Sequence, residues 1–282
     1  MAERILVTGG SGKLGKWVIA DLQEHGYQVV NADRRKAENV HTIDVDLCDL
    51  GHAYAAIAGV DAIVHLAAIP SPGGHPPEVV FNTNVMSTFN VLQAAVTLGI
   101  RKLVLASSLS ALGLAYSFRP VDLHYLPINE AHPLLAQDAY GISKIVGENM
   151  ADGFARRDPA LSVTSLRFTL ILTPEELKTV IPNLQEQEES SASILWTYID
   201  TRDAARCIRL CLQNSEAGHK IFYVNAPNTF ARKPTLDLLK KYYANVSIEA
   251  SQLGDYTAPI DCTAVSQIIG FQPEHIWNDN DG

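Results

Sequence analysis

Short apolar stretches alternate with amphipathic stretches along most of the chain. The apolar stretches are rich in β-branched residues, which favours strands, whereas the amphipathic stretches repeat their apolar positions with the period of a helix. Strands are predicted at residues 4–8, 27–33, 40–44, 61–66, 102–107, 162–168, 195–199 and 220–225. Helices are predicted at residues 14–25, 50–57, 78–98, 138–157, 201–213, 235–243 and 263–269.

The regular alternation of strands and helices indicates βαβ units. Most of the strands are apolar at nearly every position, which is typical of a parallel sheet covered by helices on both faces. We therefore predict an α/β protein with a Rossmann-type, doubly wound sheet of about seven parallel strands.

The pattern becomes less regular after Thr173, where residues 174–193 are polar and acidic. We predict a Rossmann domain over residues 1–173. Residues 174–282 are predicted to be a mixed region that completes the sheet and adds a small substrate-binding lobe. No linker rich in Pro, Gly or Ser separates the two regions, so the boundary is gradual.

Composition narrows the class of partner. The 282 residues contain 22 Lys and Arg but 31 Asp and Glu, a formal net charge of −9. This balance disfavours a nucleic acid or an anionic membrane as partner, since either needs a cationic surface. No apolar run approaches the roughly 18 residues of a membrane span, and the N-terminus does not resemble a signal peptide.

The four cysteines are too few and too scattered for a disulfide framework, which favours a reduced, cytoplasmic protein. Cys207 and Cys211 lie on one predicted helix face without a nearby His or third Cys. We interpret them as buried thiols and expect no metal site.

Residues 8–15, with the sequence TGGSGKLG, join the first strand to the first helix. Glycines at these positions permit a tight turn and a close approach of the backbone to a pyrophosphate, which the helix N-terminus would bind. Asp33 ends the second strand. It follows the glycine motif at close to the spacing of about 20 residues that is expected for a ribose-binding carboxylate. Asp33 favours NAD because it would repel a 2′-phosphate. Arg34 could instead hold that phosphate, so NADP remains an alternative.

Tyr140 and Lys144 lie one helical turn apart and therefore share a helix face. A free tyrosine has a pKa of about 10. A neighbouring ammonium and a cationic nicotinamide would both favour the phenolate, so Tyr140 could act as an acid or base near neutral pH. Taken alone, the pattern also fits an ordinary surface pair.

Ser107 and Ser108 follow a buried strand, at the sheet edge where open α/β folds bind ligands. A hydroxyl there could hold the reacting oxygen beside the tyrosine. The loop of residues 69–77, IPSPGGHPP, follows the fourth predicted strand. It is either a substrate loop that overhangs the pocket or a stiff loop in solvent.

Together these motifs resemble the extended short-chain dehydrogenases/reductases, the NAD-dependent epimerase/dehydratase group. The resemblance runs nearly end to end. Further matching segments are Asp46-Leu47, the HLAA at residues 65–68, the helix motif at residues 84–95, YIDTRDAA at residues 198–205 and IGFQP at residues 269–273.

The resemblance implies a catalytic role for Ser108, an acid/base role for Tyr140, and for Lys144 a bond to the nicotinamide ribose that also lowers the tyrosine pKa. The residues implied at the cofactor are Gly9, Ser11, Gly12, Lys13, Leu14 and Gly15 at the pyrophosphate, Asp33 and Arg34 at the adenosine ribose, Asp46 and Leu47 at the adenine, Leu66, Ala67 and Ala68 under the cofactor, Asn84 near the active-site helices, and Phe168 beside the nicotinamide. Ile69, Ser71, Ser110 and Thr169 are the predicted substrate contacts.

The chain also departs from the family pattern. Leu112 replaces a common Tyr, and Leu170 stands where many members have Asn. Leu109 and Ser110 occupy the positions of an acidic pair found in dehydratases, which disfavours 4,6-dehydration. The short stretch between Thr173 and the next strand predicts a reduced substrate lobe.

The sequence thus predicts an NAD(P)-dependent oxidoreductase or epimerase that acts by hydride transfer and tyrosine acid/base catalysis. The predicted substrate is a sugar, a sugar acid or a nucleotide sugar. Two alternatives are an NADPH-dependent reductase of small carbonyl compounds and a non-catalytic nucleotide-sensing protein on the same fold. The resemblance further implies a homodimer formed through helices 78–98 and 138–157.

Overall fold

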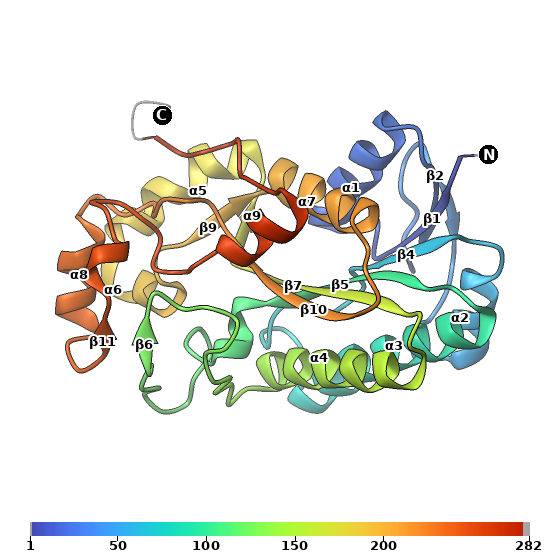
Figure 1. Ribbon diagram of the computed structural model, residues 1–282, viewed down its shortest axis with the longest axis horizontal. Helices are drawn as coiled ribbons and strands as arrows, with labels where there is room; N and C mark the ends of the chain where they lie inside the picture. The colour runs from blue at the N-terminus through green and yellow to red at the C-terminus, as the bar shows by residue number, and fades with distance from the viewer. Residues whose placement is uncertain (1, 279–282) are drawn as a thin grey trace.

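A computed structural model describes residues 2–278 and contains a central sheet of seven parallel strands. The predicted α/β fold with a doubly wound parallel sheet is therefore confirmed (Figure 1). In spatial order the strands are β3 (His41–Ile43), β2 (Gln28–Ala32), β1 (Arg4–Thr8), β4 (Ala62–His65), β5 (Lys102–Ser108), β7 (Ser162–Phe168) and β10 (Gly218–Val224).

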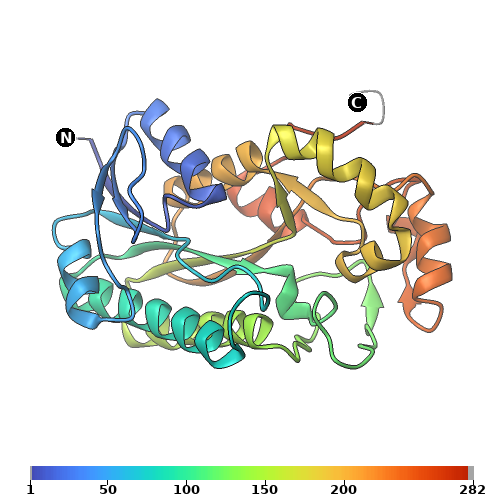
Figure 2. The ribbon, with the colours of Figure 1, turned by 180° about the vertical axis from the view of Figure 1, so that it is seen from behind.

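Helices cover both faces of this sheet, as Figures 1 and 2 show. One face carries α1 (Lys13–Glu24), α7 (Thr201–Gln213) and α9 (Thr263–Ile269), and the other carries α2 (Leu50–Ile57), α3 (Pro77–Leu98) and α4 (Ala139–Arg157). Alternate residues of β1 enter the two cores: Ile5 and Val7 pack on the α1 side and Leu6 on the α3 side. Because both faces are buried, the strands are apolar almost throughout.

The chain leaves the carboxyl ends of β5, β7 and β10 to form a smaller lobe at one end of the molecule (Figure 1). Its core surrounds Trp196, Tyr198 and Phe230. The lobe contains two paired strand sets, β6 (Tyr125–Leu126) with β11 (Ser247–Ile248) and β8 (Leu170–Leu172) with β9 (Tyr198–Asp200), and the helices α5 (Pro174–Glu186), α6 (Glu188–Ser191) and α8 (Thr235–Tyr242).

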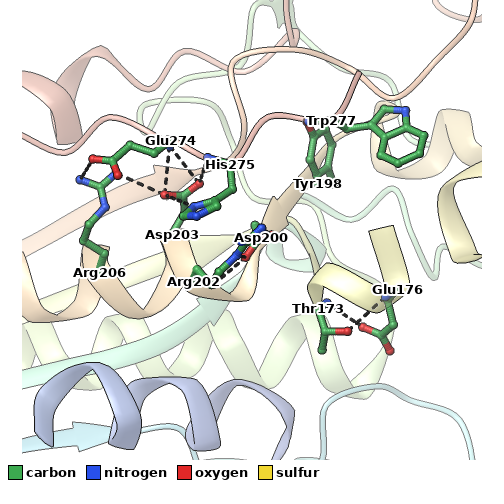
Figure 3. Close-up of polar contacts among 10 residues, drawn as sticks. All are labelled: Thr173, Glu176, Tyr198, Asp200, Arg202, Asp203, Arg206, Glu274, His275 and Trp277. Atoms are coloured by element: carbon green, nitrogen blue, oxygen red, sulfur yellow. Dashed lines mark hydrogen bonds and ion pairs between the residues drawn. The ribbon is translucent and has the colours of Figure 1, made fainter. Parts of the chain in front are cut away.

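Two details of the lobe differ from the sequence prediction. The strand expected at residues 195–199 begins only at Tyr198, because Leu195 and Trp196 adopt positive φ angles of 55° and 52° in a turn. The polar segment after Thr173 forms α5, whose first turn is closed by a capping box between Thr173 and Glu176 (Figure 3).

Residues Glu274–Trp277, here termed the C-terminal strap, contain no helix or strand and lie against α7 and β9 (Figure 3). The fully buried Asp203 carboxylate accepts hydrogen bonds from the backbone N–H groups of Glu274 at 3.0 Å and His275 at 2.7 Å. The backbone N–H of Trp277 donates to the Tyr198 hydroxyl at 2.6 Å. Polar side chains therefore hold this irregular segment in place.

Within residues 2–278, none of the helices combines the length and the apolar character that a bilayer crossing requires. Cys207 and Cys211 are both buried in the core between the sheet and α7.

Candidate active site

A cleft of about 810 Å³ runs along the carboxyl ends of the strands, from the turn after β1 to the smaller lobe. It brings together most of the residues that the sequence singled out. The predicted residues that line it are Gly9, Gly12, Lys13, Leu14, Gly15, Asp33, Arg34, Leu47, Leu66, Ala67, Ala68, Ile69, Ser108, Ser110, Tyr140, Lys144, Phe168 and Thr169.

The glycine turn forms the end of the cleft at the N-terminus of α1. A Cβ atom on Gly9, whose φ is +69°, would stand 2.7 Å from the backbone nitrogen of Ala67. A Cβ atom on Gly15 would stand 2.4 Å from the Gly9 carbonyl oxygen, whereas one on Gly12 would meet only that oxygen, at 3.1 Å. Gly9 and Gly15 thus let the turn pack, and Gly12 leaves the helix N-terminus open. This cradle fits a pyrophosphate.

Asp33 lies at the carboxyl end of β2 and lines the same end of the cleft. Its two oxygens accept hydrogen bonds from the backbone N–H groups of Ser11 at 3.1 Å and Arg35 at 2.9 Å. Ser11 itself lies outside the cleft lining, where its hydroxyl donates to the Arg35 carbonyl. Ser11 therefore acts on the shape of the turn, and the fixed Asp33 carboxylate is suited to bind ribose hydroxyls.

Arg34, which could hold a 2′-phosphate, forms an ion pair with Asp46 at 2.5 Å. The hydrogen bond from Arg34 holds the pKa of Asp46 below its usual value. Asp46 also accepts from the Cys48 backbone N–H, and it lies outside the cleft lining, whereas Leu47 lines it. The charge of Arg34 is thus already matched by a carboxylate.

Three side chains with the chemistry for acid/base work meet in the middle of the cleft. Lys144 donates from Nζ to the Ala106 carbonyl oxygen at 2.8 Å, and its Nζ lies 5.5 Å from the centre of the Tyr140 ring. Ser108 accepts a hydrogen bond from the Ser110 backbone N–H at 3.1 Å, and its hydroxyl also interacts with that of Tyr140.

Secondary structure positions this group. Asp138 caps α4 by accepting from the N–H groups of Tyr140 and Gly141 at 2.9 and 3.0 Å. Residues of β5 alternate in direction, so Ser107 points toward α4 while Ser108, the last residue of the strand, points into the cleft.

Burial dominates the electrostatics of the Ser108–Tyr140–Lys144 group. It raises the pKa of Tyr140 to about 12, although the Ser108 hydroxyl acts in the opposite direction. Burial also lowers the pKa of Lys144 to about 8, against the influence of Glu148. The chain's own groups therefore leave the Tyr140 phenol protonated near neutral pH. The sequence had suggested that Lys144 lowers the tyrosine pKa, but burial is the larger effect.

Two other predicted residues lie outside the cleft lining. Asn84 accepts from the Ile69 N–H at 2.8 Å and donates to the Ser143 hydroxyl at 3.1 Å, so it ties the loop after β4 to α4. Ser71 lies farther along that loop and does not line the cleft. Ile69 and Pro70 are the parts of the loop that do.

The structure adds lining residues that sequence reasoning missed. Tyr116 lies edge-on to Tyr140, with ring centres 6.4 Å apart, in an irregular loop that carried no periodic signal. Thr169 was predicted, and its buried Oγ1 has no hydrogen-bond partner among the described residues. Ser107 and Pro70, which belong to the serine pair and the loop considered from the sequence, also line the cleft. The missed residues are Ala32, Arg35, Val45, Thr83, Ala106, Leu109, Ala115, Tyr116, Leu170, Ile171 and Ile194.

Known proteins are similar to this chain in sequence and in structure. L-arabinose 1-dehydrogenase (NAD(P)(+)) of Haloferax volcanii is 28% identical over 217 residues, covering 75% of this chain and 83% of that protein. Uronate dehydrogenase of Pseudomonas syringae pv. tomato is 26% identical over 226 residues, covering 78% and 73%. A crystal structure of a short-chain dehydrogenase/reductase superfamily protein from Agrobacterium tumefaciens with bound NAD superimposes with a TM-score of 0.71 at 26% identity, covering 97% of this chain and 93% of that one.

Residues 5–225 match the NAD dependent epimerase/dehydratase family, a span that includes the glycine turn, the Ser108–Tyr140–Lys144 group and all of the central sheet except its first residue, Arg4. The family resemblance inferred from the motifs is therefore confirmed, and the chain belongs to the NAD dependent epimerase/dehydratase family.

Proposed function

We propose that this protein is an NAD-dependent dehydrogenase that oxidises a hydroxyl group of a sugar or sugar acid. The observation that carries the proposal is the meeting of Ser108, Tyr140 and Lys144 in the same cleft that the glycine turn and Asp33 reach. The dehydrogenases of sugars and uronates among its relatives support this substrate class. A protein that only senses a nucleotide would need the turn and Asp33 but not the catalytic group.

NAD, when bound, supplies nicotinamide C4 as the hydride acceptor and a positive charge beside the catalytic group. Tyr140 takes the proton of the substrate hydroxyl, and Ser108 hydrogen-bonds the same oxygen and keeps it beside the tyrosine. Lys144, held by the Ala106 carbonyl, presents its ammonium to Tyr140 and to the ribose side of the cleft. A positive charge near the phenol favours its ionised form, which offsets the effect of burial.

Replacement of Tyr140 by Phe tests the mechanism. The change removes only the hydroxyl, so NAD should bind with an unchanged Kd while turnover falls by about 10²-fold or more. Binding is measured by calorimetry and turnover by the absorbance of reduced nicotinamide. Wild-type turnover in Tyr140→Phe would refute the acid/base role, and a protein that binds NAD but oxidises nothing would favour the sensing alternative.

The preference for NAD over NADP rests on the adenosine end of the cleft. Asp33 would repel a 2′-phosphate, and Arg34 is already paired with Asp46. We expect a lower Kd for NAD than for NADP, and little effect of Arg34→Ala on NAD binding. Tighter binding of NADP that is lost in Arg34→Ala would overturn this assignment and favour the carbonyl reductase alternative.

The substrate end of the cleft lies between β5, the β7–β8 junction and the smaller lobe. Ser110, Thr169 and Tyr116 line it together with the apolar residues Ile69 and Ile194. A panel of aldoses, uronates and UDP-sugars identifies the substrate. Net formation of reduced nicotinamide indicates a dehydrogenase, whereas an epimer detected by NMR without net reduction would replace the proposal by an epimerase.

The proposed oligomer is a homodimer. The outer sides of α3 and α4 expose Phe81, Met86, Phe89 and Ile142, each between 36% and 38% accessible. Apolar side chains gathered on two adjacent helices favour burial against a second copy of the same surface. Light scattering at micromolar concentration should give twice the chain mass, and Phe89→Glu should give the monomer. A monomeric wild-type protein would refute this dimer.

A further inference from the structure

A second cavity, of about 20 Å³, reaches Lys144 between β5 and the helices α3 and α4. A polar cavity of about 10–15 Å³ or more is large enough for one water molecule. The side chains of Asn84, Thr88, Ser107, Lys144 and Glu148 all contribute to its lining. The cavity is therefore polar enough and large enough to bind a single water molecule.

Glu148 is the negatively charged residue of this lining, and it lies one helical turn after Lys144. Its side chain is only 5% accessible. Its Oε1 accepts from the Ser107 hydroxyl at 2.6 Å and from Arg167 Nε at 2.9 Å, and its Oε2 accepts from Arg167 Nη2 at 2.8 Å. These bonds leave acceptor capacity on Oε2, since a carboxylate oxygen has more than one lone pair. The proposed chemistry gives Glu148 no role.

Among the residues that line the cavity, Glu148 is the one that carries a carboxylate, and it lies there together with Lys144. On α4 itself the ionisable neighbours are Tyr140 and Glu148, and Arg167 of β7 lies beyond Glu148. From β4, His65 is fully buried and its pKa is lowered to about 3 by burial, so it carries no charge near neutral pH. The cavity side chains of α3 are the uncharged Asn84 and Thr88.

Lys144 and Glu148 do not form a direct ion pair in the described structure, although both line the cavity. One N–H of the Lys144 ammonium is used by the Ala106 carbonyl, and its remaining donors are available to the cleft and to the cavity. A water molecule in the cavity could accept from Lys144 and donate to the carboxylate at the same time.

We propose that Glu148 is a positioning residue for the proposed reaction, which holds Lys144 in its ammonium form through a water molecule bound in this cavity. The inference rests on the proposed function. Burial alone disfavours the charged lysine, and the carboxylate opposes that effect. Without Glu148, Arg167 would lose its ion-pair partner and Lys144 would lose the carboxylate that opposes the effect of burial; of the two cations, Lys144 is the one that can release a proton.

Replacement of Glu148 by Gln tests the role of the charge, because Gln keeps the shape and an acceptor for Ser107. The pH at which kcat/KM falls on the alkaline side should move down by about one unit, so that kcat/KM drops about fivefold at the wild-type midpoint and about tenfold well above it. At about pH 6, where Lys144 remains charged, kcat/KM should change little. Glu148→Asp, which keeps the negative charge, should bring the alkaline fall of kcat/KM back close to the wild-type pH.

Replacement of Gly147 by Ala tests the water separately. Gly147 lines the cavity, and an added Cβ atom would lie 3.9 Å from the Thr88 methyl group, an ordinary contact. The methyl group should displace the water without a clash and shift the alkaline limb in the same direction. The matched control is Gly153→Ala on the same helix, whose Cβ atom would meet Arg156 outside the cavity and should leave the pH profile unchanged.

A direct readout is the titration of Lys144 Nζ by ¹⁵N NMR in the protein alone, with the signal assigned through Lys144→Met. The titration should move to lower pH in Glu148→Gln and in Gly147→Ala but not in Gly153→Ala. An unshifted titration in Glu148→Gln, or activity reduced equally at every pH, would overturn the inference. If Glu148→Gln does not fold, Gly147→Ala decides. If the wild-type protein reduced no NAD with any substrate, the proposed function would be refuted. The NMR titration would still test the effect of Glu148 on Lys144.

Discussion

The two ends of the cleft are held together by different means. The glycine turn at the cofactor end is fixed by backbone packing, because Gly9 and Gly15 bring α1, β1 and the start of the β4 loop closer than any other residue allows. In the lobe at the substrate end, irregular segments are held by side chains that bond to backbone groups, as in the contacts of Asp203 with the C-terminal strap. The cofactor end is ordered because its glycines have no Cβ atom, whereas the substrate end is ordered by hydrogen bonds from polar side chains.

The largest effect is expected from Gly15→Ala at the cofactor end. The new Cβ atom would stand 2.4 Å from the Gly9 oxygen and 2.5 Å from Gly10 Cα, and neither backbone atom can move without opening the turn. We expect a loss of about 3 kcal/mol in the free energy of unfolding, together with much weaker NAD binding. Urea denaturation and calorimetry measure both. An unaffected variant would show that packing of this turn is loose.

Asp203→Asn is the corresponding change in the lobe. An amide keeps one acceptor oxygen but turns an NH₂ group toward the N–H donors of Glu274 and His275. It also removes the charge that Arg206 contacts at 3.2 Å. We expect the free energy of unfolding, measured by urea denaturation, to fall by about 2 kcal/mol. Asp255→Asn, at an exposed position, is the control and should be neutral. Equal stability of the two variants would contradict the role of the strap contacts.

A smaller loss in the free energy of unfolding is expected for Thr173→Ala, which removes the capping box at the start of α5. The Thr173 hydroxyl accepts from the Glu176 N–H at 3.1 Å, and the Glu176 carboxylate accepts from the Thr173 N–H at 3.0 Å. The expected cost is about 1 kcal/mol. Thr179→Ala within the same helix is the control, because that hydroxyl bonds only the carbonyl oxygen one turn earlier. A larger loss in the control would reverse this interpretation.

The smallest effect concerns Glu188, which joins α6 to Lys233 and Lys241 near α8. Hydrogen bonds from these lysines lower its pKa from 4.5 to about 2. A lowered carboxyl pKa stabilises the fold above the unfolded-state pKa, and this contribution disappears as the pH falls from about 4.5 to 2. Because both lysines are more than half exposed, solvent screens these ion pairs and Glu188→Gln should cost less than about 1 kcal/mol at neutral pH. The difference from wild type should vanish near pH 2; a constant difference would contradict the linkage.

The same contrast explains how far the sequence could predict the molecule. The sheet and its helices were predicted closely, since buried parallel strands and helix periods leave local signals; the predicted helix at residues 201–213 coincides with α7. The strand expected at residues 195–199 was misplaced, because the positive φ angles of Leu195 and Trp196 are imposed by packing in the lobe and leave no trace in local propensity.

The candidate site follows the same division. Its cofactor end could be predicted because glycine spacing and a strand-terminal carboxylate are local features. Tyr116 could not, because it comes from an irregular loop that meets Tyr140 only in the folded protein. The placement of Asn84 and Asp46 outside the cleft lining likewise depends on partners far away in sequence, Ser143 and Arg34.

The alternation at the end of β5 has a consequence for how this strand can change in evolution. Ser107 bonds to Glu148, and Ser108 lies beside Tyr140, so two adjacent and chemically identical residues belong to different networks. A residue deleted earlier in the strand would move Ser108 to the site that contacts Glu148 and Leu109 to the site beside Tyr140. An inserted residue would instead move Ser107 to the site beside Tyr140 and Ala106 to the site that contacts Glu148. Either change keeps both serines in the sequence and still removes one of the two networks, so the length of β5 matters for the site as much as the identity of its serines.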